Sequence, residues 1–128
     1  MTAALVVLGA IVGAPLRFLV DRVVQGRHRL SFPLGTVAVN LIACVGLGFL
    51  TGAASAGAAS ADLQTLLGTG LCATLSTYST FSFETLRLVE QGRLRSAGAN
   101  IAISVIACLA AAAAAAAAGD AVAQAIWA

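Results

Sequence analysis

Long runs of apolar residues, interrupted by few charges, constrain the fold of this chain more than any other feature. Of its 128 residues, 60% are hydrophobic and 9% are charged, whereas about 25% of the residues of a soluble domain are charged. A helix needs about 20 apolar residues to cross a bilayer core of about 30 Å, so four or five spans use the whole chain. We predict an all-α membrane protein with one domain, residues 1–128, and four transmembrane helices at about residues 3–24, 33–54, 62–90 and 96–118.

The same composition excludes several classes of function. The formal net charge of +2 is too small and too scattered to indicate nucleic-acid binding, so we expect membrane lipid and no nucleic acid around the protein. No plausible pair of nucleophile and base, no metal-ligand cluster and no phosphate loop indicates an enzyme. Cys44, Cys72 and Cys108 lie far apart in the sequence, without the paired spacing of a metal or redox site. We expect them to be small buried apolar residues.

The stretch from Ala73 to Phe83 concentrates polar groups inside an apolar region. It contains six serines and threonines and three aromatic residues. Burying a hydroxyl costs about 1 to 3 kcal/mol unless it is hydrogen-bonded, so the cluster indicates a hydrated path or a polar helix contact, unless each hydroxyl bonds back to its own helix. The run of β-branched and hydroxyl residues also favours a break near the middle of the third helix, and such a break is tolerated only against protein or water.

Two further polar features lie in otherwise apolar helices. Asn40 lies about two turns inside the second expected helix, where its amide must be paired. It either bonds a neighbouring helix or presents its N–H groups to a permeating anion. In the fourth helix Asn100, Ser104 and Cys108 are four residues apart and share one face. This polar stripe either lines a path or makes packing hydrogen bonds only.

Small residues recur at spacings that suit close helix packing. A Gly-x-x-x-Gly spacing lets a second helix backbone approach closely, and alanine combines high helix propensity with a thin, smooth surface. The fourth helix contains nine consecutive alanines from Ala110. The glycines are Gly9 and Gly13 in the first helix and Gly46, Gly48 and Gly52 in the second.

Three stretches combine small residues with polar and aromatic ones. The first, Gly9 to Phe18, reads Gly-Ala-x-x-Gly-Ala-x-x-Arg-Phe. The second combines Gly35-Thr36 with Val39-Asn40, and the third is Gly70-x-Cys72 leading into Ser-Thr-Tyr-Ser-Thr-Phe-Ser at residues 76–82. Together they resemble the Fluc (CrcB-type) fluoride channel family, which consists of small four-helix membrane proteins, and the resemblance covers nearly the whole chain.

The resemblance implies a passive, fluoride-selective channel that exports fluoride and lowers its cytoplasmic concentration, built as an antiparallel dimer with two pores. It also implies a structural sodium ion at the dimer interface, held by the backbone carbonyls of Ala73 and Ser76. Fluoride is a strongly hydrated acceptor, so its path must replace water with hydroxyl and amide donors and the positive edges of aromatic rings. The residues implied to line that path are Asn40, Tyr78, Ser79, Thr80, Phe81 and Ser104.

The sequence departs from the family pattern at several positions. Ala73 and Thr74 replace a pair of glycines, Tyr78 stands where a phenylalanine is usual, and Asn100 stands where the fourth helix usually has a tyrosine. A non-conducting assembly partner would account for such changes. A small multidrug-type transporter subunit is a further alternative, but it requires a membrane-embedded carboxylate in the first helix, whose single acid, Asp21, lies at its end.

The positive charges are distributed unevenly between the two sides of the expected bundle. The side that holds residues 25–31 and 91–95 has all seven arginines, and the chain has no lysine. By the positive-inside rule this places both termini outside the cytoplasm, in a multi-pass protein of the cell's inner (plasma) membrane. One orientation cannot build an antiparallel homodimer, so we predict a heterodimer with an oppositely oriented homologous subunit. The arginines are Arg17, Arg22, Arg27, Arg29, Arg87, Arg93 and Arg95.

Overall fold

A computed structural model of the protein describes residues 1–27, 32–76 and 78–127, with the backbone alone for Tyr78 and Trp127. Within these residues all regular structure is helical, as predicted. Two of the segments are short, and a π-helix, η1, lies between them. The elements are α1 (Thr2–Arg27), α2 (Leu34–Ser55), α3 (Ala61–Leu63), η1 (Gln64–Cys72), α4 (Ala73–Leu75), α5 (Tyr78–Glu90) and α6 (Leu94–Trp127).

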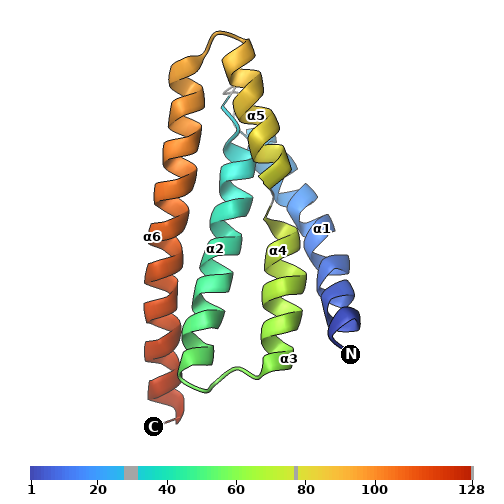
Figure 1. Cartoon of the computed structure of the whole chain (residues 1–128), viewed down its shortest axis with the longest axis vertical. Coiled ribbons are helices and arrows are strands. Elements are labelled where there is room, and N and C mark those ends of the chain that lie inside the picture. The colour runs from blue at the N-terminus through green and yellow to red at the C-terminus, as the bar shows by residue number, and fades with distance from the viewer. Residues whose placement is uncertain (28–31, 77, 128) are drawn as a thin grey trace.

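The helices lie lengthwise beside one another, so that the chain passes repeatedly between two ends of the molecule (Figure 1). Both termini and the connection from α2 to α3 lie at one end, and the connection from α5 to α6 lies at the other. Helices α2 and α6 therefore run in the same direction. Short connections between long helices produce this up-and-down arrangement.

The most extensive helix contact joins α2 to α6. A Cβ atom added at Gly48 would meet the carbonyl oxygen of Ala112, and one added at Gly52 would meet that of Ala116. On the other helix, a Cβ atom at Gly119 would meet the carbonyl oxygen of Phe49. The backbones approach this closely because the facing residues are glycine and alanine, so the sequence correctly predicted close packing by the alanine run.

Helix α1 packs on η1 through its own pair of glycines. A Cβ atom at Gly9 would lie 2.7 Å from the Cα atom of Gly70, and one at Gly13 would lie 2.7 Å from the carbonyl oxygen of Leu71. Both glycines of α1 are buried. The Gly-x-x-x-Gly spacing thus positions η1, a helix type that often lies at functional sites.

Two glycines end helices in the same way. Gly57 after α2 and Gly92 after α5 have positive φ angles, 79° and 73°, which glycine adopts without the steric cost of a Cβ atom. The amide of Gly92 donates to the carbonyl of Val89 at 3.0 Å, and the amide of Arg93 donates to that of Leu88 at 2.9 Å. Gly57 has the corresponding bonds. These Schellman motifs satisfy the last helix carbonyls and turn the chain round.

Two helix ends differ from the sequence expectation. Asp62 stands at the expected start of the third segment, and aspartate and serine both favour the N-cap position, but the backbone N–H of Leu63 donates to the side chain of Ser60 at 3.2 Å. Ser60 is therefore the N-cap, and Asp62 lies in the first turn, where its charge still complements the helix dipole. Helix α6 continues to Trp127 rather than ending near Ala118, because Gly119 packs within it against α2.

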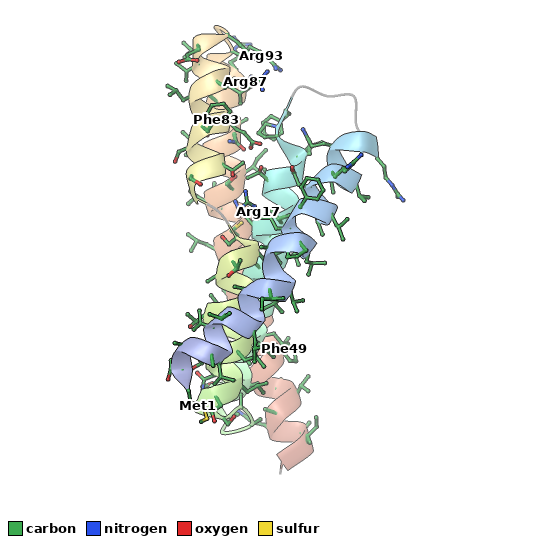
Figure 2. The ribbon with its side chains drawn as sticks, turned by 90° about the vertical axis from the view of Figure 1, so that its right-hand side faces the viewer. Met1, Arg17, Phe49, Phe83, Arg87 and Arg93 are labelled. Atoms are coloured by element: carbon green, nitrogen blue, oxygen red, sulfur yellow. The ribbon has the colours of Figure 1, made fainter. Side chains whose placement is uncertain are left out.

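Within the described part of the chain, three helices are long and apolar enough to cross a membrane: Thr2–Arg27, Leu34–Ser55 and Leu94–Ile126. Only 6% of the 18-residue apolar stretch of the third of these helices is buried inside the protein. Large apolar side chains such as Ile11, Ile106 and Leu109 are exposed. Surfaces of this kind suit a lipid environment or a partner subunit. Figure 2 shows Arg87 and Arg93 at one end of the molecule and Met1 near the other.

We expect Gly52→Ala to lower the stability of the protein by about 1 to 3 kcal/mol, as overpacking does. The added methyl group has no room beside Ala116 and Asp120. Thermal unfolding in detergent, followed by circular dichroism, measures the change. Gly98→Ala is the matched control, because a Cβ atom there meets nothing within 4 Å and should leave the transition temperature unchanged or slightly raised. Equal effects of the two variants would contradict the close α2–α6 contact.

Candidate functional site

A cavity of about 290 Å³ lies where α2, α5 and α6 meet. Residues distant in the sequence surround it, and several of them are the polar and aromatic residues that the sequence singled out. Its lining is largely apolar, with a few hydroxyl, amide and thiol groups placed around it, which is the usual composition of a small binding site. The lining residues are Asn40, Cys44, Ser76, Phe81, Ser104, Val105 and Cys108.

Asn40 and Ser76 join α2 to the segment between α4 and α5. The Ser76 hydroxyl donates to Oδ1 of Asn40 at 3.2 Å. This bond engages the oxygen of the amide and thereby fixes its orientation. Ser76 is able to reach Asn40 because its backbone is extended, with φ −73° and ψ 153°, just after α4 ends at Leu75.

The polar stripe of α6 faces the interior of the bundle, as its spacing predicted. Asn100 is completely buried and Ser104 is 8% exposed. Nδ2 of Asn100 donates to the Thr85 hydroxyl at 2.9 Å, and that hydroxyl donates to the carbonyl of Phe81 at 2.8 Å. Packing bonds therefore account for part of the stripe.

Two oxygens of this stripe are buried without a partner. Among the described residues, neither Oδ1 of Asn100 nor the hydroxyl of Ser104 has a hydrogen-bond partner. A buried polar atom of this kind calls for a water, an ion or another ligand. Because Ser104 also lines the cavity, its hydroxyl is available to a species inside it.

The α5 residues of the predicted site face in different directions. Phe81 lines the cavity, whereas Ser79 is exposed. Thr80 is half-buried and accepts a hydrogen bond of 2.7 Å from Nη2 of Arg17, on α1. Phe83, which lay outside the matched motif, is 64% exposed and is visible on the surface of α5 (Figure 2). The side chain of Tyr78 lies outside the described part of the chain.

Ala73, predicted as a backbone ligand of sodium, is not among the residues that line this cavity. It is exposed and borders a larger cavity of about 520 Å³ between α2 and η1. Its backbone is right-handed helical, with φ −66° and ψ −33°, a conformation open to every residue type. The alanine that replaces a glycine here is therefore free of backbone strain.

A second polar group, which the site residues predicted from the sequence do not include, lies near the arginine-rich end. Glu84 lies near Thr36 of α2, and its Oε2 is buried without a partner among the described residues. It lines a cavity of about 250 Å³ together with Gln25 and Arg87. The sequence feature that could have identified Glu84 is its position one turn after Phe81, at the end of the hydroxyl cluster. The sequence indicated Cys108 only as part of the polar stripe and did not indicate the cavity-lining Cys44, because sequence spacing does not show which helices meet.

Comparison with known proteins assigns the chain to a family. The family model described as CrcB-like protein, Camphor Resistance (CrcB), matches residues 4–116. The chain belongs to the CrcB-like family. This confirms the resemblance found in the sequence motifs, and the apolar helices of this CrcB-like chain are those of a multi-pass membrane protein.

Curated relatives of this CrcB-like chain are similar over most or all of their length. A Streptomyces avermitilis protein, Fluoride-specific ion channel FluC 1, is 58% identical over 128 residues, which is 100% of both chains. A Frankia casuarinae protein of the same name is 54% identical and covers 99% of each chain. Fluoride-specific ion channel FluC of Methanocaldococcus jannaschii is 41% identical over 82% of this chain and 83% of its own. All three names describe channels and not enzymes.

We expect Thr85→Val to destabilise this CrcB-like protein by about 1 to 3 kcal/mol, the usual cost of leaving a buried polar group unpaired. The substitution keeps the shape of the side chain but removes the acceptor for the buried amide of Asn100. Thermal unfolding in detergent measures the loss.

Thr51→Val is the matched control for this prediction. The Thr51 hydroxyl also donates to the carbonyl four residues earlier, that of Leu47, at 2.7 Å, but it is exposed. Its removal should change the transition temperature little. A destabilisation as large as that of Thr85→Val would show that the buried amide contact contributes nothing specific.

Proposed function

We propose that this chain is a subunit of a fluoride-selective passive channel that exports fluoride and lowers its cytoplasmic concentration. The supporting observation is the cavity in which Asn40, Phe81 and the unpartnered Ser104 hydroxyl come together. The curated relatives, which bear the name Fluoride-specific ion channel, support the choice of ion. The candidate path is lined by Asn40, Tyr78, Ser79, Thr80, Phe81 and Ser104.

The chemistry of the cavity suits a small anion that must enter and leave quickly. A hydroxyl and an amide offer N–H and O–H donors, and the edge of an aromatic ring carries partial positive charge. Such neutral donors replace water around fluoride, whereas a cationic side chain would hold the anion tightly and slow its release. No arginine is among the described residues that line this cavity.

The alternative functions have less support. A small multidrug-type transporter couples ions through a carboxylate at membrane depth in its first helix. The acid of α1, Asp21, lies near the end of that helix with its carboxylate against Gly35, at the start of α2. A non-conducting assembly partner is not favoured by relatives that are named as channels over the whole length of this chain.

We further propose that the third membrane segment is broken at Ser76 and that a structural sodium ion binds beside the break. The extended torsions of Ser76 turn its carbonyl out of the helical ladder, and backbone carbonyls are suitable ligands for a hard cation. The carbonyls of Ala73 and Ser76 provide two oxygens from one chain, which is fewer than a hard cation requires. A second subunit at the interface would provide the others.

That second subunit would be an oppositely oriented homologue, and we propose a heterodimer rather than a homodimer. Arg87 and Arg93 lie at the end of the molecule opposite Met1 (Figure 2). The positive-inside rule then directs the arginine-rich end to the cytoplasm and both termini to the outside of the inner (plasma) membrane. A chain held in one orientation needs a partner with the opposite charge bias to form an antiparallel dimer.

Liposomes that contain the complete channel should release fluoride passively. When an ionophore clamps the voltage, fluoride should appear outside while chloride stays inside, because the neutral donors replace the hydration shell of the smaller ion. A fluoride-selective electrode and a chloride electrode measure the two fluxes. Equal chloride release, or a strict requirement for a proton gradient, would overturn the proposed function.

Substitutions at the cavity should reduce this flux according to their position. Asn40→Asp should abolish it, because a carboxylate repels the anion and offers no donor. Phe81→Ile should reduce it severely, because it removes the aromatic edge from the cavity. Phe83→Ile is the matched control, since Phe83 is 64% exposed, and it should conduct nearly as well as the wild type. Loss of flux in Phe83→Ile with normal flux in Phe81→Ile would show that the assigned path is wrong.

The orientation and the partner are tested together in cells. A reporter that is active only outside the cytoplasm, fused after Ala128, should be active, and one that is active only in the cytoplasm should not. The chain expressed without a homologue should conduct little fluoride, and coexpression should restore conduction. A C-terminus found on both sides, or full conduction by this chain alone, would contradict the heterodimer.

A further inference from the structure

Cys44 and Cys108 come together although they are distant in the sequence. Cys44 lies on α2 and Cys108 on α6, and their thiols are close enough to interact electrostatically. Both are free thiols and half-buried, and both line the same cavity as Phe81 and Ser104. Two thiols on separate helices thus face a space able to hold an additional atom.

The third cysteine has different surroundings. Cys72 is buried and belongs to a core cluster with Ala43 and Leu75. Its sulfur lies 3.1 Å from the position that a Cβ atom of Gly46 would occupy. Cys72 is near enough to Cys44 for electrostatic interaction, but it is not among the residues that line the cavity. It therefore provides an internal control.

We propose that Cys44 and Cys108 form a binding site for a soft, two-coordinate d10 metal ion, such as Hg²⁺, in the wall of the cavity. Soft metal ions prefer thiolate ligands, and two thiols that interact across one cavity need only a small shift to hold one ion between them. Each thiol gives up its proton on binding. One Hg²⁺ and two thiols give one neutral bis-thiolate complex and two released protons.

The neutrality of this complex favours the site inside an apolar bundle. An uncompensated charge taken from water into a low-dielectric interior is costly, whereas two thiolates balance the charge of one divalent ion. The bound ion would lie beside Phe81 and Ser104. The effect of the bound ion on conduction rests on the proposed function, whereas the binding of the ion to the two thiols does not.

The test uses the full-length protein in detergent, titrated with HgCl₂. We expect one Hg²⁺ per chain to bind tightly, with the near-ultraviolet absorption of mercury thiolates, two protons released, and two thiols lost to a colorimetric thiol reagent. In Cys44→Ser and in Cys108→Ser, competition with dithiothreitol should show binding at least tenfold weaker. Cys72→Ser should bind as the wild type does. If a serine variant does not fold, Cys44→Ala or Cys108→Ala replaces it.

Each outcome decides a separate point. One thiol consumed per Hg²⁺, retention of the two-thiol complex without Cys44 or Cys108, or its loss in Cys72→Ser would overturn the site. In liposomes that contain this chain together with its homologous partner subunit, Hg²⁺ should reduce the fluoride flux at least tenfold with the wild-type chain and with Cys72→Ser, and dithiothreitol should reverse the block. Tight binding with undiminished flux would overturn the position beside the path. Binding by this chain, when the channel that it forms with its partner subunit carries no fluoride, would support the site while contradicting the proposed function.

Discussion

The close approach of α2 and α6 is the contact on which the rest of the structure depends. Lipid offers no hydrogen bonds and no hydrophobic drive for helix association, so membrane helices associate through tight packing of small residues. Gly48 and Gly52 on α2 meet the carbonyls of Ala112 and Ala116 on α6. This contact aligns the two helices in parallel and fixes which residues further along them face each other.

The cavity lies further along the same α2–α6 interface. Four residues before Gly48 lies Cys44, which meets Cys108, and one turn earlier Asn40 and Ser104 line the cavity. Residues four apart share a helix face. Along the α2–α6 interface the facing side chains therefore become larger, from glycine and alanine through cysteine to asparagine and serine. The helices are tightly packed where the side chains are smallest, and space for a polar site opens where they are larger.

Hydrogen bonds divide the polar cluster into groups that support the fold and groups left to a ligand. Thr85 accepts from the buried Asn100 amide and Thr80 accepts from Arg17, so these hydroxyls attach α5 to α6 and to α1. The Ser104 hydroxyl has no partner among the described residues. An unpaired buried hydroxyl costs free energy, and contact with a small anion would offset that cost. In the proposed channel, stability and conduction would therefore depend on neighbouring atoms of one cluster.

The sequence by itself determined the membrane class, the helical fold, the glycine and alanine packing faces and the polar stripe through Asn100 and Ser104, because hydropathy and a helical period act within one segment. The motifs also determined the family. Only the tertiary structure decided that Ser60 rather than Asp62 caps its helix, that Phe81 faces the cavity while Phe83 faces outward, and that Cys44 meets Cys108. The periodicity of a sequence shows which residues share a face of one helix. It does not show which other helix that face contacts, because this depends on how whole helices pack together.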